Sequence, residues 1–504
     1  MIKLIYRIES DYMSKKRMLI VTSVTLSVVT ISLGIVKLYQ TYALSNYIGT
    51  VTDTGIDVYI NDDSYASIPA NGSSNVYYML TNTNPGTVKY GVAYQTTSGV
   101  TVKVYDTSED PATGTIEEND KKYIKLHLEN KNSTNKTIEL STVLGYENGG
   151  DLVVPSGVTL VTDTYTPPPT AAEYITKLYT TASKTTVTNN SITYNTAPSV
   201  SLMNDRLGGT TTDLDGGNIR YYGASPNNYI YFNCSDYSNQ TSSTCETWRI
   251  IGVFDGKLKL IRGSQIGTYS WDNKNISTGA EDDRGKNDWT TARLMKLLNP
   301  DDYYINDNND KDSEGNYLGY SLYYNSASGM CFTDEGVNYS ACDFTSTGIK
   351  NDETRNMIAE TTYNLGGWND TGVYPNEIYE YERGTTVYTG RPTTWTGKIA
   401  LAYPSDYGYA ADLNQCKQTL ANYDNSTCTS NNWMKAIITD NGSNHGWLLT
   451  PDSSYSYVAW YSQGNVGEYF TGAARGAVPV LSLSSKLGIE SGDGSSSNPY
   501  KLSA

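Results

Sequence analysis

An uninterrupted apolar segment near the N-terminus constrains this chain most strongly. Residues 18–36 read MLIVTSVTLSVVTISLGIV and contain no charged side chain. At about 1.5 Å per residue, a helix of this length spans the roughly 30 Å hydrocarbon core of a bilayer. A basic cluster at residues 15–17 precedes it, and such clusters stay on the cytoplasmic side. We therefore predict a transmembrane signal anchor over residues 18–39, a cytoplasmic N-terminus over residues 1–17, and an extracellular remainder.

A cleaved secretory signal peptide is the alternative for this segment. It would end near Ala43, with Thr41 three places from the cut. The apolar region of a signal peptide usually spans roughly 7 to 15 residues, whereas this run is longer and is followed by Lys37. We therefore favour the retained anchor and expect a single-pass protein of the cell membrane.

The composition narrows the class of partner. Lys and Arg number 37 against 53 Asp and Glu, a net charge of −16, which argues against general affinity for nucleic acid or anionic lipid. Tyr numbers 45 and Phe only 5, and the tyrosine hydroxyl favours rings that meet water. We expect a water-facing aromatic surface. The two histidines, His127 and His445, leave little for histidine-based zinc or acid–base chemistry.

The six cysteines fall into three neighbouring pairs. These are Cys234 with Cys245, Cys331 with Cys342, and Cys416 with Cys428. Each pair encloses a polar loop, and a bridge across such a loop restricts the unfolded chain by about 3 kcal/mol. We expect three local disulfides, although the sequence leaves other pairings open.

Two domains follow the predicted anchor. Residues 46–163 alternate short apolar–polar segments with turns, a pattern typical of an immunoglobulin-like β-sandwich. Three consecutive prolines then impose an extended spacer, and we assign residues 164–217 to a proline-containing linker with a short helix at 171–182. Residues 218–504 mix strands with a few helices and predict an α+β domain.

Local signals are clearest at two places in this second domain. Asp255 and Gly256 join the strands expected at 247–254 and 257–263, and this dipeptide favours a tight hairpin. Residues 288–300 (DWTTARLMKLLNP) predict a helix with an Asp cap and a Pro stop.

Residues 445–483 resemble the final strands of a domain of unknown function common in surface proteins of Gram-positive gut bacteria and mycoplasma relatives. The matching segments are 447–451 (WLLTP), 459–464 (AWYSQG) and 476–481 (GAVPVL). Leu449 and Val478 stand where the family has arginine. The resemblance covers roughly residues 218–504 and implies a C-type-lectin-like or formylglycine-enzyme-like fold, used mostly for binding. The cysteine pair that acts in formylglycine-generating enzymes has no counterpart here.

Aromatic residues are the best candidates for ligand binding. The final hairpin contributes Trp447, Tyr455, Tyr457, Trp460, Tyr461 and Tyr469, and the entry strands contribute Tyr221, Tyr222, Tyr229 and Tyr231. Flat rings offer apolar area at low entropic cost, and neighbouring amides offer hydrogen bonds. This mixture suits a glycan or protein ligand, while inward packing is the alternative for each ring.

Two segments could hold calcium, the one cofactor that we consider. Their candidate ligands are Asn369 and Asp370 in one, and Asp310, Asp312 and Glu314 in the other. The first belongs to a Trp-Asn-Asp tripeptide like that of calcium-dependent lectins. The second copies the first half of an EF-hand loop, with Ser321 where the bidentate Glu belongs.

No motif points firmly to catalysis. Glu380 and Glu382 are a carboxylate pair of the kind used in glycoside hydrolysis, but the chain lacks GxSxG, SxxK and HExxH. We interpret the chain as a non-catalytic, membrane-anchored adhesin of a bacterial surface that binds a glycan or a host or bacterial surface protein, without nucleic acid. The alternatives are a cell-wall glycan hydrolase and a structural envelope or appendage subunit. The sequence leaves the ligand and the oligomeric state open.

Overall fold

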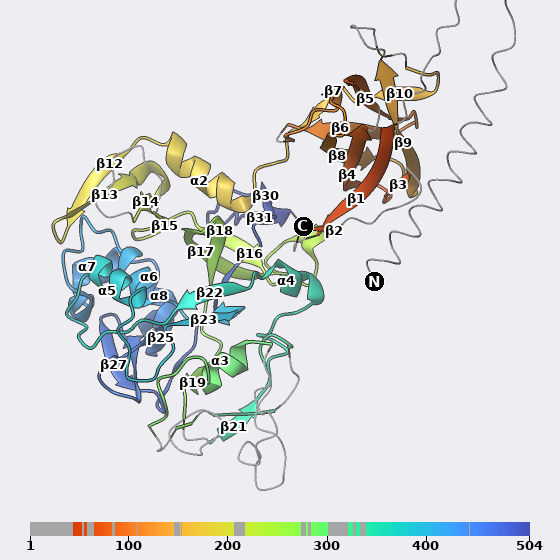
Figure 1. Cartoon of the computed structure of the whole chain (residues 1–504). Helices are drawn as coiled ribbons and strands as arrows, with labels where there is room; N and C mark the ends of the chain where they lie inside the picture. The colour runs from red at the N-terminus through yellow and green to blue at the C-terminus, as the bar shows by residue number, and fades with distance from the viewer. Residues whose placement is uncertain are drawn as a thin grey trace, which may run out of the picture. The chain divides into compact units, whose positions relative to one another are not determined.

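The computed structural model separates the chain into two compact units, Met1–Pro167 and Pro168–Ala504 (Figure 1). It describes residues 44–52, 55–57, 65–82, 86–106, 108–145, 152, 154–205, 217–273, 279–280, 284–300, 321–325, 329–332, 339–442 and 444–503. The predicted anchor over residues 18–39 lies outside these ranges. Among the residues that are described, no helix is long and apolar enough to cross a membrane.

The first unit is built from two β-sheets. One has the strand order β11-β6-β8-β4-β1-β2 and the other β10-β5-β9-β3, with β7 beside β5. The strands are β1 (Leu44–Thr52), β2 (Gly55–Asp57), β3 (Tyr65–Ile68), β4 (Gly72–Asn82), β5 (Val88–Gln95), β6 (Val100–Tyr105), β7 (Thr113–Ile116), β8 (Lys121–Asn130), β9 (Lys136–Gly145), β10 (Val158–Leu160) and β11 (Thr164–Tyr165). Tyr78 and Leu126 of the first sheet share one buried cluster with Val92 and Leu140 of the second. This packing fits the predicted sandwich, and the immunoglobulin-like assignment stays a prediction.

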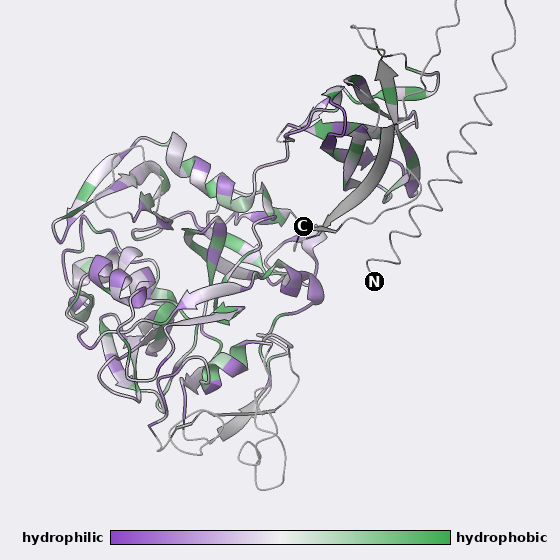
Figure 2. Cartoon of the chain, in the orientation of Figure 1, coloured by the Kyte–Doolittle hydropathy of each residue, from purple (hydrophilic) through white to green (hydrophobic). Residues whose placement is uncertain are grey.

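The second unit contains a nine-stranded and a five-stranded sheet in its described part. Their orders are β12-β13-β14-β15-β17-β18-β29-β24, with β16 beside β17, and β19-β28-β25-β26-β27. The strands of the larger sheet are β12 (Thr185–Asn189), β13 (Ile192–Ala197), β14 (Leu202–Asn204), β15 (Ile219–Tyr221), β16 (Tyr229–Phe232), β17 (Glu246–Phe254), β18 (Lys257–Arg262), β24 (Ile399–Ala400) and β29 (Val480–Ser482). Those of the smaller sheet are β19 (Thr268–Ser270), β25 (Gly446–Pro451), β26 (Val458–Ser462), β27 (Val466–Phe470) and β28 (Ala474–Gly476). Apolar residues of β16, β17 and β18, among them Ile230, Ile250 and Leu260, belong to the main buried cluster of this unit (Figure 2).

Short helices and strand pairs complete this unit. The helices are α2 (Ala171–Thr181), α3 (Arg293–Leu298), α4 (Asp352–Met357), α5 (Pro375–Glu382), α6 (Pro404–Tyr409), α7 (Ser426–Ser430) and α8 (Lys435–Ile438). The strand pairs are β20 (Gly329–Phe332) with β21 (Tyr339–Cys342), β22 (Thr361–Asn364) with β23 (Thr394–Gly397), and β30 (Gly488–Ser491) with β31 (Lys501–Ser503). The helix predicted over 288–300 is shorter, since Asp288 caps a turn by accepting hydrogen bonds from Thr290 before α3 begins.

The structure does not extend a linker over the whole of residues 164–217, but the short helix predicted at 171–182 is present as α2. Thr164 and Tyr165 form β11 of the first unit, so the spacer is far shorter than predicted. Thr170 caps α2 by a reciprocal pair of hydrogen bonds with Glu173, as such Thr-x-x-Glu sequences favour. The following strands β12 to β14 extend the large sheet. From Pro168 onward, the segment therefore belongs to the second unit.

Two of the three expected disulfides are confirmed. Cys234 is bonded to Cys245, and Cys416 to Cys428. Each bridge closes a short loop, and all four of these cysteines are buried. The third predicted pair, Cys331 and Cys342, has its backbone on β20 and β21, and its side chains lie outside the described residues.

Many tyrosines lie in the core, which corrects the expectation of a mainly water-facing aromatic surface. Tyr78, Tyr90 and Tyr407 are all 0% exposed. Their hydroxyls are nevertheless hydrogen-bonded, for example from Tyr90 to the Pro111 carbonyl at 2.9 Å and from Tyr407 to the Gly464 carbonyl at 2.5 Å. A buried tyrosine costs little when its hydroxyl has a partner, so here it fills the place that phenylalanine takes elsewhere.

Candidate functional site

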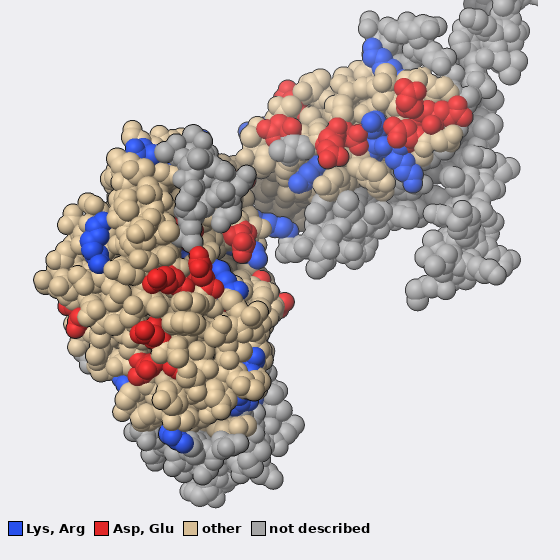
Figure 3. All heavy atoms as spheres, turned by 60° about the vertical axis from the view of Figure 1, so that its left-hand side comes forward, with Lys and Arg blue, Asp and Glu red and all other residues tan. Residues whose placement is uncertain are grey.

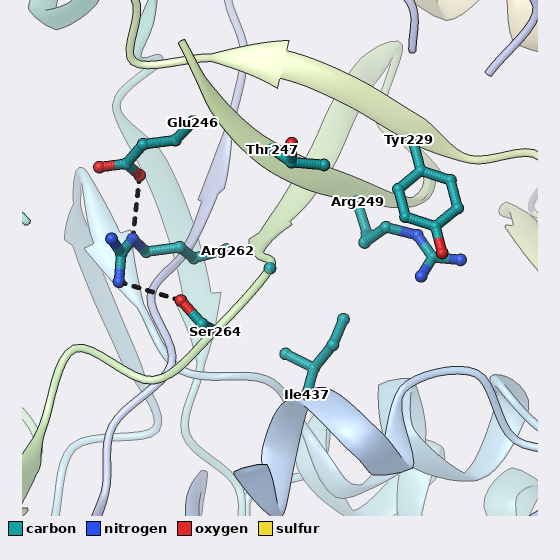
Figure 4. Close-up of a pocket in the computed structure, with 8 residues that line it drawn as sticks. Tyr229, Glu246, Thr247, Arg249, Arg262, Ser264 and Ile437 are labelled. Carbon is teal, nitrogen blue, oxygen red and sulfur yellow. Dashed lines mark hydrogen bonds and ion pairs between the residues drawn. The ribbon is translucent and has the colours of Figure 1, made fainter. Parts of the chain in front are cut away.

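A pocket of about 420 Å³ opens beside the hairpin of β17 and β18 (Figure 4). Asp255 and Gly256 connect the two strands with positive φ angles of 48° and 70°, which confirms the predicted Asp-Gly hairpin. Along β17, Trp248 and Ile250 pack into the main core, while Ile251 faces a second buried cluster that contains Trp433. The alternation of a strand therefore turns Arg249 toward that second side.

Arg249 is the most informative residue of this pocket. Its guanidinium lies 3.7 Å from the ring centroid of Tyr229, its cross-strand neighbour, and 4.8 Å from that of Trp433. Nε donates to Asn228 Oδ1 at 2.5 Å, and Nη2 to the Pro226 carbonyl at 3.3 Å. The side chain is 7% exposed, and burial lowers the pKa of Arg249 to about 10. Within the described residues it has no carboxylate partner, although buried charges are normally paired.

A second arginine forms the opposite wall of the pocket. Arg262 donates from Nε to Glu246 Oε2 at 2.9 Å and from Nη1 to the Gln265 carbonyl at 3.3 Å. Glu246 also accepts hydrogen bonds from Trp248 and Asn233, each at 3.0 Å. Arg262 is thus paired with a carboxylate, whereas Arg249 has none among the described residues. Figure 4 shows the two arginines on opposite sides of the pocket.

Two of the predicted ligand-binding aromatics are buried, which corrects their assignment. Trp447 and Trp460 are both 0% exposed. Their indole N–H groups donate to backbone carbonyls, Trp447 to Tyr269 at 2.9 Å and Trp460 to Trp368 at 3.2 Å. They are core residues, because the strand alternation that presents one side chain outward turns its neighbours inward.

The predicted tyrosines are more accessible. Tyr455 is 54% exposed and Tyr469 42% exposed, while Tyr457 and Tyr461 are half-buried. Tyr455 and Tyr457 face each other with ring centroids 6.0 Å apart. On the entry strands, Tyr221 and Tyr222 are buried, and Tyr229 lines the pocket.

Of the predicted metal ligands, the structure describes only Asn369 and Asp370. Asn369 donates to Ser454 Oγ at 2.9 Å, and Asp370 accepts from the Gly372 amide at 2.8 Å. Asp310, Asp312 and Glu314 lie outside the described residues. The described part of the chain holds no group of three Asp, Glu, His or Cys side chains placed to bind a metal ion. Calcium stays a prediction.

A pair of carboxyl groups lies beside the Asn369 loop. Asp452 is 0% exposed, and its Oδ1 accepts from the backbone amides of Ser454 and Tyr455 at 2.5 and 2.8 Å. Burial, together with a hydrogen bond and the charge of Asp452, raises the pKa of Glu468 to about 7. Glycoside hydrolysis needs two carboxyls that flank the sugar, whereas Asp452 is buried and held by backbone amides.

A buried charge network was not anticipated from the sequence. Arg220 contacts Asp205 and donates from Nη1 to Asp406 Oδ1 at 2.9 Å, and Lys259 contacts the other oxygen of Asp406. These four residues are at most 5% exposed. The two basic residues hold the pKa of Asp406 below its usual range against the effect of burial. The signal was present as a basic residue within each of the apolar strands β15 and β18, but the partners come from distant segments.

No family model matches this chain, and no curated protein sequence matches it.

Proposed function

We propose that the second unit is a non-catalytic binding module that recognises a carboxylate-bearing ligand, and that the protein is an extracellular, membrane-anchored adhesin. Arg249 is the observation that supports this proposal. Its buried guanidinium has no carboxylate partner among the described residues, and it lies at the wall of a pocket large enough for a sugar ring. An arginine fork binds carboxylate with strong, directional hydrogen bonds.

An acidic glycan fits this pocket better than a neutral one. Tyr229 offers a flat ring for the apolar face of a sugar, and Thr247 and Ser264 line the pocket with hydroxyls. On the face shown in Figure 3, acidic and basic side chains are scattered among uncharged ones, so this face offers a polyanion no extended basic patch. Recognition would therefore come from one local site, and nucleic acid is not an expected partner.

The resemblance to Gram-positive surface domains agrees with this proposal and stays part of it. For the alternative of a cell-wall hydrolase, the described carboxyls offer little support. Glu382 is 0% exposed and Glu380 is exposed on the same helix, so they do not face one cleft. No specific observation favours a structural subunit.

Calorimetry with the purified chain tests the proposal. Glucuronic and galacturonic acid are expected to bind, whereas glucose and galactose are not, in buffers with and without calcium. Arg249→Gln should weaken binding about tenfold or more, since a hydrogen bond to a charged group is worth about 1.5–3 kcal/mol.

Lys257→Gln is the matched control, because it removes one positive charge at the far end of β18. Thermal unfolding of each variant confirms that its fold is intact. Equal binding of acidic and neutral sugars, or unchanged binding by a folded Arg249→Gln variant, would refute the proposal.

A further inference from the structure

A second arginine without a carboxylate partner lies on the smaller sheet. Arg475 of β28 donates from Nη1 to His445 Nδ1 at 2.5 Å, while its Nε is buried without a hydrogen-bond partner. The guanidinium lies 4.0 Å from the ring centroid of Tyr461 and 4.5 Å from that of Tyr469. Within the described ranges no acidic side chain pairs with it. Aromatic faces hold this cation in place and leave part of its hydrogen-bonding capacity unused.

The neighbouring His445 can donate a hydrogen bond to an anionic ligand and does not compete with that ligand as an acceptor. His445 is exposed, and its ring stacks on Tyr461 at 5.4 Å with an interplanar angle of 23°. Because Nδ1 accepts from Arg475, the neutral ring carries its proton on Nε2. Burial and the positive charge of Arg475 both lower the pKa of His445. We call His445, Tyr461, Tyr469 and Arg475 the arginine–tyrosine cluster.

This cluster borders the proposed ligand pocket through one side chain. Gln265 follows Ser264 of the pocket wall, and its Nε2 donates to the Ile438 carbonyl at 2.8 Å, next to the pocket residue Ile437. On its other side, Gln265 packs against Gly476, where a Cβ would lie 2.0 Å from the Gln265 side chain. Gly476 directly follows Arg475, so Gln265 contacts the segments that carry both sites.

We infer that the arginine–tyrosine cluster is a second anion subsite, and that the ligand is an acidic oligosaccharide with at least two carboxylates. One carboxylate would bind Arg249 in the pocket, and a second would bind Arg475 beyond Gln265. Tyr469, which is 42% exposed, offers a ring face for the intervening sugar. This inference rests on the proposed function and extends it from a single acidic sugar to a chain of them.

The test compares ligands of increasing length. Calorimetry with the purified chain uses galacturonic acid and its short linear oligomers. The parent protein should bind an oligomer about tenfold more tightly than the monomer, after correction for the number of repeats. Arg475→Gln should abolish this gain and leave monomer affinity unchanged, whereas Arg249→Gln should weaken binding of both.

Two further variants complete the design. Tyr469→Ala alters an exposed ring and should reduce oligomer affinity about threefold, which keeps the test open if Arg475→Gln does not fold. Lys257→Gln should change neither affinity. If no acidic sugar binds at all, the proposed function fails. If the monomer binds but longer oligomers gain nothing, or if folded Arg475→Gln retains the full gain, only the second subsite is refuted.

Discussion

Glu382 is expected to make the stability of the second unit depend on pH. It lies at the end of α5, is 0% exposed, and accepts hydrogen bonds from the amide and hydroxyl of Ser405 at 2.9 and 2.5 Å. Burial raises its pKa to about 7, against the opposing effects of Arg383 and Ser405. The folded unit therefore holds the Glu382 proton more tightly than the unfolded chain does.

The size and sign of the effect follow from this pKa. A rise from the ordinary 4.5 to about 7 corresponds to about 3.5 kcal/mol in full, at about 1.4 kcal/mol per tenfold change in proton affinity. Because the folded pKa is the higher one, the contribution is fully present below pH 4.5 and is lost as the pH rises to about 7. Glu382→Gln mimics the protonated side chain. The free energy of unfolding of the variant minus that of the parent should therefore increase by about 3 kcal/mol between pH 4 and pH 8.

Tryptophan fluorescence makes this measurement specific to the second unit. All 8 tryptophans of the chain lie beyond residue 168, so urea unfolding followed by their emission does not report the first unit. Glu380→Gln, an exposed glutamate on the same helix, is the control and should leave the difference independent of pH. Other titrating groups affect parent and variant alike and cancel in the comparison. A Glu382→Gln difference that stays constant to within about 0.5 kcal/mol would refute the reasoning.

Two other substitutions test the buried side chains of this unit by the same urea assay. Asp406→Asn should lower the free energy of unfolding by about 3–5 kcal/mol, because it leaves buried basic side chains without one of their carboxylates; a loss under 1 kcal/mol would contradict the role assigned to the network. Trp460→Ala should lower the free energy of unfolding by about 3–5 kcal/mol, because it leaves a cavity in the core. Tyr469→Ala alters an exposed residue and should change the free energy of unfolding by less than about 0.5 kcal/mol. Similar values for the two variants would show that Trp460 is not a core residue.

Features that depend on neighbouring residues were predictable from the sequence. The hairpin of β17 and β18 follows from the Asp255–Gly256 turn, whose residues accept positive φ angles. The disulfides at Cys234 and Cys416 were anticipated because each closes a short loop. In these cases few residues decide the structure, and all of them lie close together in the chain.

Features that depend on distant segments were not predictable. Trp460 was assigned to a ligand surface, because strand alternation separates two faces without showing which one is covered. Residues 164–217 were assigned to a linker with a short helix, because their polar sequence does not show that β14 pairs with β15. Both errors concern contacts made by a part of the chain far away in sequence.

The unpaired charge of Arg249 also could not be predicted from the sequence. An arginine within the apolar strand TWRIIGVF is a visible anomaly, yet buried arginines usually find a carboxylate, as Arg220 does. Whether a partner exists depends on which elements pack beside the strand. The sequence therefore identified Tyr229 as a possible binding residue, while the unpaired charge emerged only from the folded unit.

The way the chain enters the second unit determines how that unit would respond to mechanical tension. The Ala171 amide donates to the Leu487 carbonyl at 2.6 Å, and Thr170 pairs with Gly488 at the start of β30. A pull transmitted through the first unit would therefore load α2 and the C-terminal strand pair first. Since α2 packs on β17 and β18, the strands that carry Arg249 would keep their shape until that helix is detached. In an adhesin of the proposed kind, tension would thus strain the entry of the module before its ligand pocket.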